Sequence, residues 1–121
     1  MDRPITSSEA ALVRWMLDHA SVADASAFSG NSMESLRVID KWCDCGCASL
    51  NFQEDHKGKW VVADALAVYP DGQQAGLILW ALQSEIVLLE VHDMDLDSSH
   101  RVPTVADLRS YEEMGQSLLT S

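Results

Sequence analysis

The chain has 121 residues, of which 47% are hydrophobic and 22% are charged. A chain of this length can bury enough apolar surface to fold as one domain without metals or disulfides. Eight basic residues against nineteen acidic ones give a formal net charge of −11. Because nucleic-acid phosphates and anionic membrane surfaces are bound by clustered cations, this composition argues against both classes of ligand.

The acidity is uneven along the chain. Residues 1–60 hold nine acids and six bases, whereas residues 61–121 hold ten acids and two bases. The second half is therefore the negative pole, and a field of one sign favours encounter with a cationic protein or a metal ion. The first residues show no cationic stretch followed by an apolar segment, and no apolar run approaches the ~20 residues of a spanning helix. We therefore expect a cytoplasmic protein without a membrane partner.

A helix is predicted near the start of the chain. The sequence from Thr6 to Glu9 is a capping box, in which the side chain of each residue accepts a hydrogen bond from the backbone amide of the other. The helix is expected to end near Ala20, and a short second helix is predicted over residues 22–28. Side chains at helical spacing form one stripe that should face the core: Leu12, Trp15, Met16 and His19.

The hydrophobic period changes to that of strands after residue 35. Strands over 36–42 and 48–53, separated by the turn 43–47, predict a hairpin. Strands over 60–69, 77–82 and 85–91 predict a three-stranded antiparallel meander, with a Tyr-Pro-Asp-Gly turn at 69–72. The alternation slips by one residue at His92–Asp93, which predicts a bulge or the end of strand pairing there.

A weaker capping box, Thr104 to Asp107, predicts a C-terminal helix from about Val105. Leu108, Tyr111 and Leu118 would form its apolar side. Helices that flank a run of strands indicate an α+β domain. The expected fold is thus an N-terminal helix or two, an antiparallel sheet of about five strands, and a C-terminal helix packed on one face.

Three cysteines lie within five positions, at Cys43, Cys45 and Cys47. Zinc takes four tetrahedral sulfur or nitrogen ligands, so three thiolates would need one more ligand, and His56 or His92 is the candidate. Structural zinc sites usually have wider cysteine spacings, which leaves two alternatives open. The thiols either stay reduced as small residues of a turn or take part in redox chemistry.

The acidic residues Glu90, Asp93, Asp95 and Asp97 are the candidate partner-binding residues. The run 93–97 does not fit a calcium loop, since Ser98 stands where glycine is needed. A strand edge protected by charge is the alternative interpretation of this run. Glu90 and His92 also share one predicted strand face, where they either line a catalytic groove or belong to a solvated surface.

The segment from Val38 to Phe52, with its C-x-C-G-C-x-S-x-x-F pattern, resembles a group of small bacterial proteins of unknown function. The likeness extends from Leu12 to about Leu108 and implies a bacterial, cytoplasmic source, but no activity. Because the second half of the chain is acidic, we expect a protein-binding module, of an immunity or regulatory type, that binds a basic protein and is not an enzyme. The alternative is a zinc-binding module that uses the three cysteines.

Overall fold

The computed structural model describes residues 3–19, 36–39, 49–83, 85–94 and 101–110. Within them, the long elements are helix α1 (Ser7–His19) and strands β4 (Trp60–Val68), β5 (Gln74–Leu82) and β6 (Glu85–Asp93). Four strands are short, namely β1 (Arg3–Pro4), β2 (Arg37–Val38), β3 (Leu50–Asn51) and β7 (Leu108–Arg109), and η4 (Val105–Asp107) is a 3₁₀ turn. No helix in these ranges is long and apolar enough to cross a membrane.

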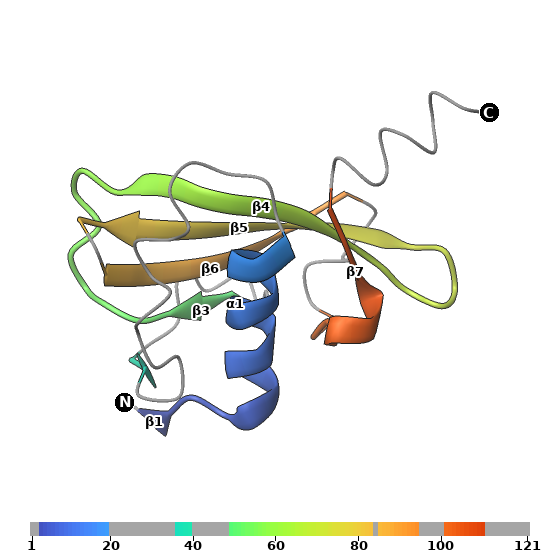
Figure 1. Cartoon of the computed structure of the whole chain (residues 1–121), viewed down its shortest axis with the longest axis horizontal. Helices are drawn as coiled ribbons and strands as arrows, with labels where there is room; N and C mark the ends of the chain where they lie inside the picture. Colours follow the sequence, from blue (N-terminus) through green and yellow to red (C-terminus); the bar gives the residue numbers. More distant parts are fainter. Residues whose placement is uncertain (1–2, 20–35, 40–48, 84, 95–100, 111–121) are drawn as a thin grey trace.

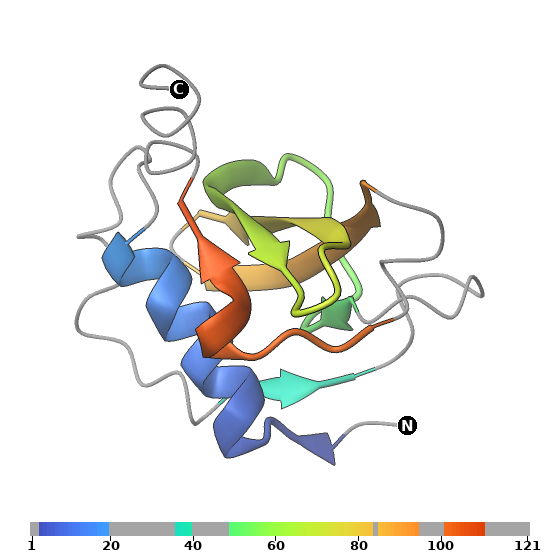
Figure 2. The same cartoon turned by 90° about the vertical axis from the view of Figure 1, so that its right-hand side faces the viewer.

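A five-stranded antiparallel sheet in the order β3-β6-β5-β4-β7 is the centre of the fold, and β1 and β2 form a separate antiparallel pair. Helix α1 lies across one face of the large sheet, as Figures 1 and 2 show from two directions. The α+β class and the antiparallel sheet of about five strands are thus confirmed. The predicted start of the helix at Thr6 is confirmed as well.

The capping box at the start of α1 is formed as predicted. The Thr6 hydroxyl accepts a hydrogen bond from the Glu9 amide at 3.1 Å, and the Thr6 amide donates to Glu9 Oε1 at 2.9 Å. The buried side of the helix differs in part from the predicted stripe and consists of Ala10, Leu12, Val13 and Met16. His19 is exposed, because its ring stacks on Trp15 at 4.8 Å instead of entering the core. The predicted second helix lies outside the described residues.

The three-stranded meander of β4, β5 and β6 is confirmed, including its turn at 69–72. At the first turn the Gly72 amide donates to the Tyr69 carbonyl, and Gly72 adopts a φ of 89°, which favours glycine. Strand pairing between β5 and β6 ends at Asp93, opposite Ala75, as the slip in alternation predicted. Two register shifts that the sequence did not reveal leave Val62 and Val87 as extra residues on either side of Trp80.

The predicted first hairpin is described only at its open end, because residues 40–48 lie outside the described part of the chain. β2 pairs with β1, and β3 pairs with β6 at the sheet edge. A single described hydrogen bond, from the Ile39 amide to the Asn51 carbonyl at 2.8 Å, joins the two segments that were expected to form the hairpin. This bond fits the predicted hairpin, whereas the pairing of β3 with β6 and of β2 with β1 was not predicted.

The prediction of a helix from Val105 is wrong over the described residues. Thr104 and Asp107 do form the capping box, yet only one 3₁₀ turn follows. Leu108 has φ −79° and ψ 141°, an extended conformation, and it pairs with Ala67 as part of β7. The burial of Leu108 beside the sheet therefore outweighs continuation of the helix, and residues 111–121 lie outside the described part.

The core lies between α1 and the sheet. Small side chains on β4 and β5 let the helix approach the sheet closely, and they are Ala63, Ala65, Ala67, Ala75 and Ala81. Larger side chains on β5 and β6 fill the remaining space, and these are Leu77, Leu79, Ile86, Leu89 and Val91. One face of the sheet thereby packs against α1, while the opposite face carries polar residues beside the buried residues Leu66, Leu88 and Asn51.

Candidate functional site

The second face of the sheet, opposite α1, has a composition unlike that of the core face. Its cross-strand rows follow from the strand registers. One row is Asn51, Leu88, Trp80 and Val61; the next is Glu90, Ile78 and Asp64; the third is His92, Gly76, Leu66 and Arg109. Two carboxylates, an indole, an imidazole and the guanidinium-bearing residue Arg109 thus share the face that the packing of α1 does not use.

Glu90 is held in place by Trp80, its diagonal neighbour on β5. The indole Nε1 donates a hydrogen bond to Glu90 Oε1 at 3.0 Å, and both side chains are half-buried. The Lys59 ammonium lies 4.9 Å from the centre of the Trp80 ring, within the range of a cation–π contact. A hydrogen bond to a charged acceptor is stronger than a neutral one, so Glu90 is presented in a fixed position.

Asp64 lies in the same row as Glu90, on the other side of Ile78. Directly paired residues on adjacent strands have Cβ atoms about 5 Å apart, so the Cβ atoms of Asp64 and Glu90 are separated by about 10 Å across the sheet. Ile78 between them is half-buried, and Val61 in the next row is 38% exposed. The result is a surface with Ile78 between two acidic positions and with Trp80 and Val61 in the neighbouring row, a mixture of apolar, aromatic and polar groups that protein interfaces also contain.

His92 packs against the backbone of β5. A Cβ atom added at Gly76 would collide with the imidazole ring, so the ring lies directly over the glycine. Glu90 and His92 do share one face, as predicted. The ring of His92 is engaged in packing over Gly76, and no described bond connects the two side chains as a catalytic pair would require.

The other predicted acidic residues are Asp93, at the end of β6, and Asp95 and Asp97, which follow it in the chain. Asp93 is the last paired residue of β6, and its side chain is outside the described part of the chain. Asp95 and Asp97 also lie outside it. Of the four residues predicted to bind a partner, only Glu90 therefore has a described side chain.

His56 belongs to a hydrogen-bonded cluster at the end of β3. Its Nε2 lies 2.8 Å from Asn51 Oδ1 and 2.8 Å from the Gln53 carbonyl. Both partners are acceptors, so Nε2 carries the proton and Nδ1 carries the lone pair in the neutral ring. This bond satisfies Asn51, which is buried although the predicted alternation made it a surface residue.

The segment that contains Cys43, Cys45 and Cys47 lies outside the described residues, but its two flanks are described. The bond from the Ile39 amide to the Asn51 carbonyl closes the base of this segment, and Asn51 also contacts His56 through its side chain. Among the described residues no group of three or more His, Cys, Asp or Glu side chains is arranged to hold a metal. His56 and His92 are thus the described members of the predicted zinc set.

Comparison of the chain with protein-family models, with curated proteins and with solved structures gives no match. The fold and the second face define the chain as an α+β domain with one sheet face devoted to the core and one that carries fixed polar groups.

Lys59, Ile78 and Trp80 were not identified from the sequence as residues of this surface. A signal was available for Ile78, because residues 74 to 82 alternate small or aliphatic core residues with a second series that includes Trp80. The two bulges conceal the corresponding alternation on β4 and β6, since each shifts the phase by one residue.

Proposed function

We propose that this chain is a protein-binding module, of an immunity or regulatory type, whose second sheet face docks onto a basic surface of another protein. The proposal rests on one observation above all, namely that Glu90 and Asp64 flank the half-buried Ile78 on the sheet face opposite α1, next to Trp80 and Val61. Charge complementarity then determines the occupant, because the chain carries a net charge of −11.

The arrangement around Trp80 supports a fixed binding surface. Aromatic side chains are enriched in interface hot spots, where they lose little conformational entropy on binding. The bond from Trp80 to Glu90 holds both side chains before a partner arrives, which reduces the entropic cost of association. A partner that presents Lys or Arg side chains around an apolar patch would match this surface.

The test begins with the full chain immobilised at low salt, and the retained proteins are identified and purified. The dissociation constant of the purified partner is then measured for three forms of the chain. These are the unaltered chain, the double variant Asp64→Asn with Glu90→Gln, and the control Asp18→Asn with Glu54→Gln. Asp18 and Glu54 are exposed, and Asp18 lies on α1, so the control removes the same charge elsewhere.

The proposal predicts a basic partner whose affinity falls as salt rises, because salt screens exposed charges with a Debye length of about 8 Å at physiological ionic strength. The Asp64/Glu90 double variant should bind at least about tenfold more weakly, a change of about 1.4 kcal/mol. The control should bind nearly as well as the unaltered chain. Equal losses in both variants, affinity that does not change with salt, or retention of no basic protein would contradict the proposal.

A zinc-binding module is the second candidate function, and the contacts of Asn51 support it. Asn51 accepts a hydrogen bond from the amide of Ile39, the last described residue before the cysteine segment, and its side chain also contacts His56. A histidine thus lies near a flank of the segment that carries the three thiols. Zinc-bound histidines commonly donate their other ring N–H to a carbonyl oxygen, and His56 Nε2 makes such a contact with Gln53. Nδ1 of His56 would then be the fourth ligand.

Metal analysis separates the two functions. The zinc module predicts one equivalent of zinc in the purified chain and thiols that react with a thiol reagent only after a chelator is added. The variant His56→Gln should weaken zinc retention, whereas His19→Gln on the exposed end of α1 should not. Three freely reactive thiols and no zinc would eliminate this candidate and leave the protein-binding proposal untouched.

A further inference from the structure

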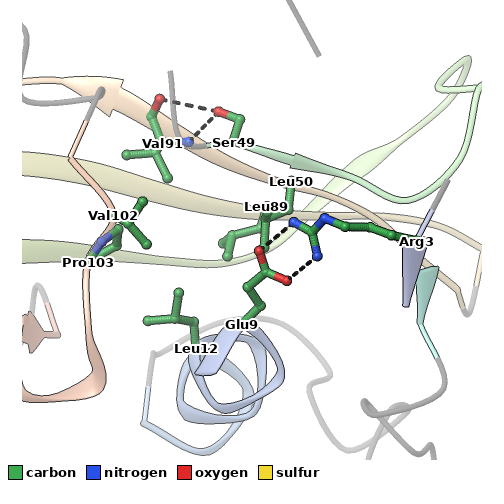
Figure 3. Close-up of a pocket in the computed structure, with 9 residues that line it drawn as sticks. All are labelled: Arg3, Glu9, Leu12, Ser49, Leu50, Leu89, Val91, Val102 and Pro103. Carbon is green, nitrogen blue, oxygen red and sulfur yellow. Dashed lines mark hydrogen bonds and ion pairs between the residues drawn. The ribbon is translucent and has the colours of Figure 1, made fainter. Parts of the chain in front are cut away.

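A pocket of about 240 Å³ opens on the core side of the sheet, away from the second face. It lies between α1, the edge formed by β3 and β6, and residues 102–103 (Figure 3). Six apolar residues form most of its wall, namely Leu12, Leu50, Leu89, Val91, Val102 and Pro103. Four of these are buried members of the core, so the pocket reaches the interior of the domain.

Three polar side chains also line the pocket, and each forms hydrogen bonds with other groups of the same chain. Arg3 makes a two-pronged bond to Glu9, with N···O distances of 2.8 and 2.7 Å. The hydrogen bond from Arg3 holds the pKa of the Glu9 carboxyl below its ordinary value, so the pair stays charged and its net charge is zero. Ser49 Oγ accepts from the Val91 amide at 2.8 Å and lies 3.3 Å from the Val91 carbonyl, to which it donates.

The outer wall of the pocket is held in place by contacts of Arg101, the residue that precedes it in the chain. The guanidinium of Arg101, the residue before Val102, stacks over the Tyr69 ring at 4.0 Å and bonds to Asp71 at 2.8 Å. The Tyr69 hydroxyl in turn lies 3.3 Å from the Arg101 carbonyl and donates to it. These contacts hold Val102 and Pro103 over the opening, although the Val102 side chain itself is 71% exposed.

We propose that this pocket binds a small, neutral, apolar molecule between benzene and indole in size. An engineered cavity of about 150 Å³ lined by aliphatic and aromatic side chains stays dry and binds benzene, so a pocket of this volume has room for such a ligand. Its polar groups are already paired with each other or with the backbone, which leaves shape and apolar contact as the basis of selection. A negatively charged ligand would also be opposed by the net charge of the protein.

The test follows the methyl resonances of the full chain by NMR as indole is added. Saturable shifts are expected for Leu12, Leu50, Leu89 and Val91. Benzoate, an anion of similar size, should bind at least about tenfold more weakly, a difference of about 1.4 kcal/mol. Shifts that do not saturate, shifts confined to other regions such as the second face, or tighter binding of benzoate would overturn the proposal.

A pair of variants checks the location. Val102→Trp places a large ring over the opening and should weaken indole binding at least about tenfold. Val105→Trp, at a residue that is 38% exposed and does not line the pocket, should leave binding within about twofold. Far-UV circular dichroism confirms that both variants fold, and Val102→Phe replaces Val102→Trp if that variant does not. Equal binding by the Val102 and Val105 variants would place the ligand elsewhere and overturn the assignment.

Discussion

The contact between Gly76 and His92 leads to a prediction in which the sign of a mutational effect reverses. A glycine inside a strand is ordinarily unfavourable, and its replacement by alanine stabilises a protein by about 0.5–1 kcal/mol when the backbone permits it. The backbone of Gly76 does permit it, because its φ lies outside the left-handed region. The three heavy atoms nearest to the new methyl group all belong to the His92 ring.

Overpacking of this kind typically costs about 1–3 kcal/mol. We therefore expect Gly76→Ala to lower the free energy of unfolding by about 1–3 kcal/mol in the unaltered chain. In a chain that already carries His92→Ala, the ring is gone, and the same substitution should raise the free energy of unfolding by about 0.5–1 kcal/mol. The coupling between the two positions is then about 1.5–4 kcal/mol, since the two effects have opposite signs.

Urea denaturation of the four proteins, followed by tryptophan fluorescence, measures this cycle. Gly58→Ala is a contrasting case, because Gly58 has a φ of 87° and should lose stability whatever residue occupies position 92. The placement of His92 over Gly76 would be refuted if Gly76→Ala had the same effect in both backgrounds, or if it stabilised the unaltered chain.

Three further predictions concern the helix cap, acid stability and the Trp80 contact. Thr6→Ala should lower the free energy of unfolding by about 1 kcal/mol, measured by urea denaturation, because the Glu9 amide loses its acceptor; an unchanged midpoint would count against the cap. The hydrogen bond from Arg3 lowers the pKa of Glu9, so its contribution to stability is full above the ordinary carboxyl pKa and is lost as the pH falls through the lowered pKa. The stability difference between the unaltered chain and Glu9→Gln, followed by thermal melts from pH 7 downward, should therefore shrink in acid, and a difference that grew in acid would contradict this. Trp80→Phe removes the donor to Glu90 and should cost about 1–2 kcal/mol, and the cost of Glu90→Gln should fall in that background; equal costs in both backgrounds would mean that the bond is absent.

Local signals in the sequence were sufficient for much of the fold. The capping box of Thr6 and Glu9 fixes the start of α1, and proline and glycine at positions 70 and 72 fix the turn that starts the meander. Each of these depends on residues a few positions apart. The end of strand pairing at Asp93 was also predictable, because the alternation changes phase there.

The errors come from contacts between distant segments. The pairing of β3 with β6 depends on residues about forty positions apart, and no local pattern distinguishes it from a hairpin. The same reason explains why the predicted C-terminal helix is wrong. The capping box at Thr104 is formed, but Leu108 pairs with Ala67 of β4 instead of continuing a helix. Bulges at Val62 and Val87 concealed which residues share the second face with Glu90.

The candidate site was predictable only in part. Glu90 and His92 were identified because they are two residues apart on one strand, where side chains must share a face. Asp64 and Trp80 join them only through the register of three strands, which a sequence read along the chain does not specify. The pocket lined by Arg3 and Val102 brings together residues from both ends of the chain and has no local signature.

The indole N–H resonances of the chain test the proposed binding surface most directly. Trp80 Nε1 lies on the second face and donates to Glu90, whereas Trp15 belongs to α1 on the opposite side of the sheet. When the purified basic partner is added, the Trp80 indole resonance should shift and saturate with the measured dissociation constant, while that of Trp15 should not move. A shift of the Trp15 resonance with an unchanged Trp80 resonance would show that the partner binds elsewhere and would contradict the account.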